Sequence, residues 1–136
     1  AADAIPGIIN MKQAADLANV EPILVAKGNC GIPEWIDGKI CYSGTPELRA
    51  IYTKMAIDSG ARIIGGCCGT SPKHVAEMRK VIDSHEKGDT PDLARIESEL
   101  GVITSGAKAQ MGGDLTIAGG AAGPGHKASG RSRRRR

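Results

Sequence analysis

The chain has 136 residues, 40% of them apolar types, which is enough for one small domain with a hydrophobic core. No apolar run is long enough to cross a bilayer, and the N-terminus lacks the charged and apolar regions of a signal peptide, which argues against a membrane or secreted protein. The formal net charge of +3 is unevenly distributed, because residues 102–136 carry seven Lys or Arg and one acid, which leaves residues 1–101 at −3. The basic character therefore belongs to the tail.

The first half of the chain predicts a helix, a strand and a second helix. Residues 5–18 place Ile5, Ile8 and Ile9 on one side of a helix. The short apolar run 22–26 is typical of a strand buried on both faces. A loop follows, in which residues 39–42 are expected to form a small extended arm. Thr45-Pro46 then provides a helix start, with Thr as N-cap and Pro in the first position.

The second half predicts a strand and two more helices before the sequence loses its periodicity. Gly60 ends the helix that begins at Pro46, and residues 61–64 form a second buried strand. Ser71-Pro72 opens a helix that ends within residues 83–88, and residues 91–100 form a short amphipathic helix. From residue 104 the chain is rich in Gly, Ala and Ser and ends in an arginine run, a composition typical of a disordered basic tail.

The order helix–strand–helix–strand–helix defines an α/β fold with parallel strands and right-handed crossovers. Two strands cannot form a stable parallel sheet that is covered on both faces. We therefore expect that the chain either oligomerises or is a piece of a larger α/β protein, with a barrel as the best candidate.

Adjacent Cys67 and Cys68 stand between glycines, in Gly-Gly-Cys-Cys-Gly-Thr over residues 65–70, directly after the second strand. Neighbouring Cα atoms lie about 3.8 Å apart, closer than most disulfides allow. Two successive thiols can instead reach one soft metal ion where glycines let the backbone bend. The alternative is that both are small side chains packed in a tight turn. The four cysteines do not follow a secreted disulfide pattern, which favours a reduced, cytoplasmic setting.

Residues 64–74, Ile-Gly-Gly-Cys-Cys-Gly-Thr-Ser-Pro-Lys-His, resemble the signature of the zinc-dependent homocysteine S-methyltransferases. Residues 27–33, 37–39 and 44–47 are similar to the segment that this family places between its last two strands. The resemblance spans about residues 1–83. It implies a (β/α)₈ TIM barrel, of which this chain provides the last two strands and their helices. The implied domains are a C-terminal barrel portion over 1–88, a helical extension over 89–103 and the tail over 104–136.

The resemblance implies a Zn²⁺ cofactor held by three cysteine thiolates, two of which map onto Cys67 and Cys68. The family's third cysteine lies in a Gly-x-Asn-Cys motif, and Gly28-Asn29-Cys30 is similar to it. The residues around Cys30 and its distance to Cys67 instead match the turn after the next strand. On that register the third ligand lies upstream of Ala1, and Asn29 and Cys30 are candidates for lining the substrate pocket.

The implied reaction is methyl transfer to the thiol of homocysteine, which gives methionine, with betaine as the expected donor. The partners are then small molecules, and a chain with two of the three thiolates is expected to be inactive alone. Two other functions stay open. One is a non-catalytic zinc module built from Cys30, Cys67 and Cys68, and the other is nucleic-acid binding through the arginine run. The lack of aromatic residues within that run argues against nucleic acid.

Overall fold

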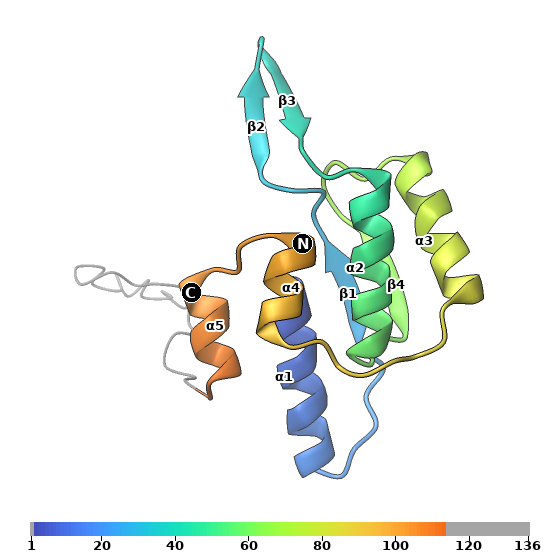
Figure 1. Cartoon of the computed structure of the whole chain (residues 1–136), viewed down its shortest axis with the longest axis vertical. Helices are drawn as coiled ribbons and strands as arrows, with labels where there is room; N and C mark the ends of the chain where they lie inside the picture. The colour runs from blue at the N-terminus through green and yellow to red at the C-terminus, as the bar shows by residue number, and fades with distance from the viewer. Residues whose placement is uncertain (1, 114–136) are drawn as a thin grey trace, which may run out of the picture.

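The computed structural model describes residues 2–113, which form a small mixed α/β unit (Figure 1). Nine elements follow in chain order: α1 (Ala4–Leu17), β1 (Val25–Gly28), β2 (Pro33–Ile36), β3 (Lys39–Tyr42), α2 (Pro46–Asp58), β4 (Ile63–Gly66), α3 (Pro72–Ser84), α4 (Leu93–Leu100) and α5 (Ser105–Met111). The helix–strand alternation predicted up to residue 84 is confirmed.

Strands β1 and β4 pair in parallel, and Gly28 lies opposite Gly66 at their carboxyl ends. Helix α1 packs against β1 and α3 packs against β4, while α2 contacts both of these helices. The order β1–α2–β4 is the crossover unit that the sequence predicts, in which two parallel strands are joined through a helix. Both strand ends therefore meet at one edge of the sheet.

The expectation that both strands are buried on two faces is wrong for this structure. Along β1, Ala26 and Gly28 are buried under the helices, whereas Val25 and Lys27 are exposed. Ile63 of β4 is also exposed, to 53%. Within residues 2–113 the helices cover one face of the two-stranded sheet, so its other apolar face has no covering layer. This arrangement is consistent with a part of a larger α/β domain.

Helix α2 begins and ends where its capping residues predict. The Thr45 hydroxyl accepts a hydrogen bond from the Leu48 N–H at 3.2 Å, and Pro46 occupies the first turn. At the other end Gly60 has φ +95°, a left-handed conformation that glycine adopts without strain. The apolar side of this helix places Tyr52 and Met55 at the centre of the core, with no exposed surface.

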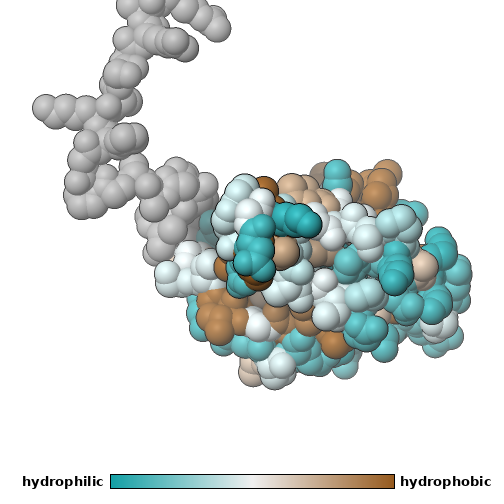
Figure 2. All heavy atoms as spheres, turned by 90° about the horizontal axis from the view of Figure 1, so that it is seen from above, coloured by the Kyte–Doolittle hydropathy of each residue, from teal (hydrophilic) through white to brown (hydrophobic). Residues whose placement is uncertain are grey.

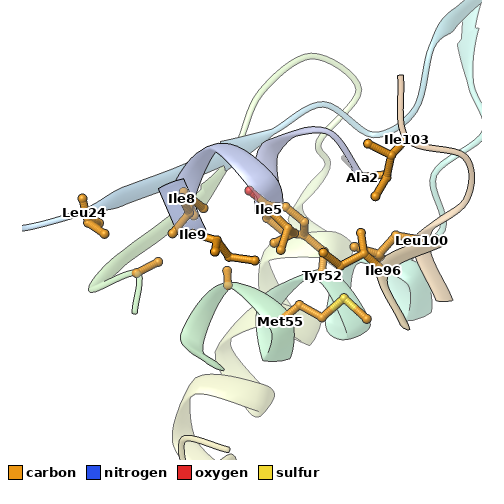
Figure 3. Packing of buried hydrophobic residues seen from close by; sticks show 13 residues of the cluster. Ala2, Ile5, Ile8, Ile9, Leu24, Tyr52, Met55, Ile96, Leu100 and Ile103 are labelled. Carbon is orange, nitrogen blue, oxygen red and sulfur yellow. The ribbon is translucent and has the colours of Figure 1, made fainter. Parts of the chain in front are cut away.

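The core lies between the sheet and helices α1, α2 and α4 (Figure 3). Helix α4 is the amphipathic helix predicted over residues 91–100, and it supplies buried Ile96 and Leu100. Ile103, three residues after the helix ends at Leu100, is 2% exposed. Residues 93–103 therefore contribute to the same core as the elements before them.

Residues 105–111 differ from the predicted disordered tail, because they form helix α5. The Thr104 hydroxyl caps this helix by accepting a hydrogen bond from the Ala107 N–H. The Thr104 backbone N–H donates to Asp3 Oδ1 at 2.8 Å. Lys108 Nζ forms an ion pair with Glu97 Oε1 at 2.7 Å. Composition alone does not predict these contacts, because they join residues that are far apart in the chain. The arginine run at 131–136 lies outside the described residues.

Strands β2 and β3 form a hairpin that projects from the body (Figure 1). The predicted arm over residues 39–42 is β3, and its partner β2 was not expected. Asp37 and Gly38 both have positive φ, 49° and 75°, as a two-residue hairpin turn requires. Trp35 pairs with Ile40, and both are largely exposed.

Seen from the side of the hairpin, apolar surface occurs in separate areas among hydrophilic ones (Figure 2). None of the helices in the described part of the chain has the length and apolar character needed to cross a membrane.

Candidate metal centre

Cys67 and Cys68 lie in the turn between β4 and α3, next to the loop that follows β1. The Cys67 N–H donates to the Gly28 carbonyl at 3.2 Å, and the Cys30 N–H donates to the Cys68 carbonyl at 3.0 Å. Two hydrogen bonds therefore join the loops after β1 and β4. Both loops lie at the same edge of the sheet, because the two parallel strands end there.

The two vicinal thiols are exposed, and their Sγ atoms are 3.9 Å apart. In a tetrahedral zinc site with Zn–S bonds of about 2.3 Å, two thiolates lie about 3.8 Å from each other. The observed separation fits two corners of such a site. Their exposure leaves room for further ligands from outside this turn.

The other two cysteines do not join this pair. Cys30 is 3% exposed, and its Sγ lies 3.4 Å from Thr70 Oγ1. Cys41 is exposed on β3 of the hairpin. Within residues 2–113, no three His, Cys, Asp or Glu side chains lie close enough to hold a metal ion together. The three-thiol module of Cys30, Cys67 and Cys68 is therefore not formed in this structure.

A cavity of about 570 Å³ opens at the carboxyl end of β1. Asn29 and Cys30, the two residues proposed to line a substrate pocket, are both in its wall. Further lining comes from the start of α2, including Thr45 and Arg49, and from the segment after α4. The loop after β1 thus borders the vicinal cysteines through backbone hydrogen bonds and this cavity through its side chains.

The side chain of His74 braces the turn and has no free ring nitrogen for a metal. Its Nδ1 accepts a hydrogen bond from the Ser71 N–H at 3.0 Å, so Nε2 carries the proton and donates to the Gly44 carbonyl at 3.0 Å. This arrangement resembles a capping box with histidine as the reciprocal partner. His74 therefore ties the start of α3 to the segment before α2.

Sequence reasoning missed two residues around the cysteine turn, Arg49 and Tyr42. Arg49 is 3% exposed, and its Nη2 donates to the Gly28 carbonyl and, at 3.3 Å, to Thr70 Oγ1. The Tyr42 ring packs against Gly69, which has φ +77° and no room for a Cβ. Partial burial and the neighbouring Cys68 raise the pKa of Tyr42 above 10.0. Of the residues in these contacts, Gly69 could be singled out from the sequence, because glycines stand on both sides of the two cysteines.

The family model described as homocysteine S-methyltransferase matches residues 6–82, which is more than half of the chain. The chain belongs to the homocysteine S-methyltransferase family. The matched region begins in α1 and ends near the end of α3, so it contains both parallel strands and the vicinal cysteines.

Three yeast proteins from Saccharomyces cerevisiae are similar to parts of the chain. Homocysteine S-methyltransferase 1 is 56% identical over 32 residues, which cover 24% of this chain and 10% of the relative. Homocysteine S-methyltransferase 2 is 39% identical over 64 residues, covering 46% of this chain and 20% of the relative. A putative uncharacterized protein is also 39% identical over 64 residues, with 46% of this chain and 61% of its own length covered. The matched part thus spans between about a tenth and three fifths of these relatives. No solved structure matches the chain.

Proposed function

We propose that the chain is the C-terminal part of a (β/α)₈ barrel that transfers a methyl group to the thiol of homocysteine. Family membership supports the reaction class. The barrel is supported by the parallel β1–β4 pair and by its uncovered face, which carries exposed Val25 and Ile63. In a closed barrel this face would point inward, where side chains of the other parallel strands would cover it.

The observation that carries the proposal is the 3.9 Å separation of Cys67 Sγ and Cys68 Sγ in a turn at the carboxyl end of a parallel strand. Active sites of parallel barrels lie at this end of the strands. We assign the two thiolates as zinc ligands and place the third family cysteine outside residues 1–136. Coordination that the protein thiolates leave open would be available to the substrate thiol.

Zinc supplies acidity at this site when bound, since coordination deprotonates a thiol that is mostly protonated at neutral pH. Cys67 and Cys68 would hold the cation in place, and the cavity at the carboxyl end of β1 would admit the substrate. The homocysteine sulfur then attacks the methyl carbon of the donor. The new bond joins sulfur to carbon, and the electron pair of the broken bond stays on the donor nitrogen or sulfur. The thiol proton goes to solvent.

We propose betaine as the methyl donor, because transfer from its positively charged nitrogen releases a neutral amine. Donor contacts are assigned to loops outside this chain. A reduced, cytoplasmic compartment fits the four free cysteines, since the exposed vicinal pair has to stay reduced to bind a metal.

The test compares zinc binding by the 136-residue chain with binding by single Cys→Ser variants. Cys67→Ser and Cys68→Ser remove a ligand, whereas Cys41→Ser removes an exposed hairpin thiol and serves as the matched control. We expect wild type and Cys41→Ser to bind zinc weakly, and the other two to lose that binding. Binding that survives in both ligand variants would overturn the assignment.

Homocysteine should tighten zinc binding by wild type, because its thiolate takes a coordination position, and homoserine, which has a hydroxyl in place of the thiol, should not. Equal effects of the two compounds would contradict the substrate assignment. Methionine formation from betaine should be negligible for this chain alone. Robust formation would show that the chain contains a complete site.

A further inference from the structure

Thr70 occupies the space directly beneath the vicinal-cysteine turn. Its backbone N–H donates to the Cys67 carbonyl at 3.1 Å, and its side chain lies against the Cα of Gly66, where a Cβ would overlap it. Its hydroxyl lies 3.4 Å from the buried Cys30 Sγ. One side chain therefore contacts the last residue of β4, the turn itself and the loop after β1.

Arg49 connects this threonine to the end of β1. The same Nη2 donates to Thr70 Oγ1 and to the Gly28 carbonyl, which also accepts the Cys67 N–H. The guanidinium lies over the Tyr52 ring, 4.9 Å from its centroid, and this stacking fixes its plane. Arg49 on α2 is thereby bonded to the last residue of β1 and to the turn that follows β4.

The buried Arg49 guanidinium makes few of the hydrogen bonds that would offset its loss of water. This argues against a role in stability alone. Its Nε and Nη1 have no hydrogen-bond partner among residues 2–113, and neither does the Tyr52 hydroxyl. Burying a charge away from water is costly, and hydrogen bonds that are not made do not offset that cost. The bonds that Arg49 does make join the end of β1 to the turn after β4, which favours a positioning role.

We propose that Arg49 and Thr70 are positioning residues that hold Cys67 and Cys68 in the orientation needed to bind one metal ion, an inference that rests on the proposed zinc role of these cysteines. Groups that orient metal ligands typically change metal affinity by 10- to 100-fold when they are removed. The two residues are coupled, because one Arg49 nitrogen bonds both the Thr70 hydroxyl and the Gly28 carbonyl, which also accepts the Cys67 N–H. Losing either residue should therefore loosen the same turn.

The test measures zinc affinity, thermal stability and the alkylation rates of Cys67 and Cys68 by iodoacetamide in the full chain. The variants are Arg49→Met, Thr70→Val and the double variant. Thr70→Ser retains the hydroxyl and should preserve wild-type affinity. Thr53→Val is the control, because Thr53 is a buried threonine whose hydroxyl donates to the Arg49 backbone carbonyl within α2, at 2.8 Å, away from the turn.

Arg49→Met and Thr70→Val should each weaken zinc binding by about 10-fold or more, with an unchanged or higher melting temperature for Arg49→Met. The double variant should lose less affinity than the sum of the two single losses, because the two side chains are hydrogen-bonded to each other. Cysteine alkylation rates should change in both variants and stay at the wild-type value in Thr53→Val.

Wild-type zinc affinity and alkylation rates in both variants would overturn the inference, as would an affinity loss that only follows a loss of folding. A wild-type chain that binds no zinc would instead remove the metal assignment. The alkylation rates of Cys67 and Cys68 would then still decide whether Arg49 and Thr70 position the turn.

Discussion

His74 Nε2 donates a hydrogen bond of 3.0 Å to the carbonyl of Gly44, thirty residues earlier in the chain. The same ring caps the first turn of α3 through Ser71, so one neutral imidazole joins the helix after the cysteines to the segment after the hairpin. The side chain is 8% exposed. The histidine that follows the vicinal cysteines therefore supports their turn from the helix side.

His74→Ala should destabilise the fold by about 1–2 kcal/mol, because it removes a helix cap and a long-range hydrogen bond together. Urea unfolding followed by circular dichroism measures this loss. Lys73→Ala, at the exposed neighbouring position, is the control and should change stability little. A His74→Ala variant as stable as Lys73→Ala would show that the two hydrogen bonds contribute nothing.

Asp58 at the end of α2 organises the connection to α4. Its buried Oδ1 accepts hydrogen bonds from His85 Nε2 and from the Gly88 N–H, both at 2.8 Å, and Arg95 Nη1 lies 3.8 Å from Oδ2. Asp58→Asn removes the charge and one acceptor oxygen. We expect a loss of about 2–3 kcal/mol in unfolding free energy.

Asp83→Asn is the matched comparison, because Asp83 pairs with Arg79 one turn away on the surface of α3. Exposed pairs of this kind contribute little to stability, so the melting temperature should fall much less than in Asp58→Asn. Equal shifts in the two variants would contradict the structural role given to Asp58.

The docking of α5 should depend on pH through Glu97. Hydrogen bonds from Lys108 and from the Ile103 N–H hold the pKa of Glu97 below its usual value of 4.5. A carboxyl group with a depressed pKa in the folded state stabilises that state fully above the unfolded pKa and loses this contribution as pH falls through the folded pKa. Helix α5 should therefore loosen as the pH falls from about 5 to about 3.

NMR shifts of the α5 backbone amides report this change locally, which matters because Glu47 and Asp83 also have lowered pKa values. In Glu97→Gln the NMR shifts of the α5 backbone amides should be the same at both ends of this pH range. A wild-type α5 that is unchanged at low pH would contradict the contribution of the Glu97–Lys108 pair.

The sequence predicted those helices and strands whose ends are marked by residues nearby in the chain, such as helix-capping residues. Thr45-Pro46 and Ser71-Pro72 start helices, and the vicinal cysteines follow a strand, as their neighbours along the chain indicate. Arg49 could not be assigned this way, because its role depends on strand register, which brings Gly28 and Gly66 together. Helix α5 was missed for a similar reason, since the Asp3–Thr104 hydrogen bond joins residues 101 positions apart.

The last prediction uses the two neighbouring glycines of β4 as a matched pair. A Cβ on Gly65 would find its nearest neighbour, Lys27 Cγ, at an ordinary contact distance of 3.6 Å. A Cβ on Gly66 would overlap the Thr70 side chain. Gly65→Ala should therefore be tolerated, whereas Gly66→Ala should displace Thr70 and cost about 1–3 kcal/mol of stability.

The Gly66→Ala chain should also bind zinc more weakly than Gly65→Ala, because the displaced threonine no longer holds the Cys67 carbonyl. Urea unfolding and zinc competition on both variants measure the two effects. In Gly66→Ala/Thr70→Ser the smaller side chain relieves part of the overlap and keeps the hydroxyl, so stability should partly return. Equal behaviour of the two single variants would show that the contact between Gly66 and Thr70 does not constrain the cysteine turn.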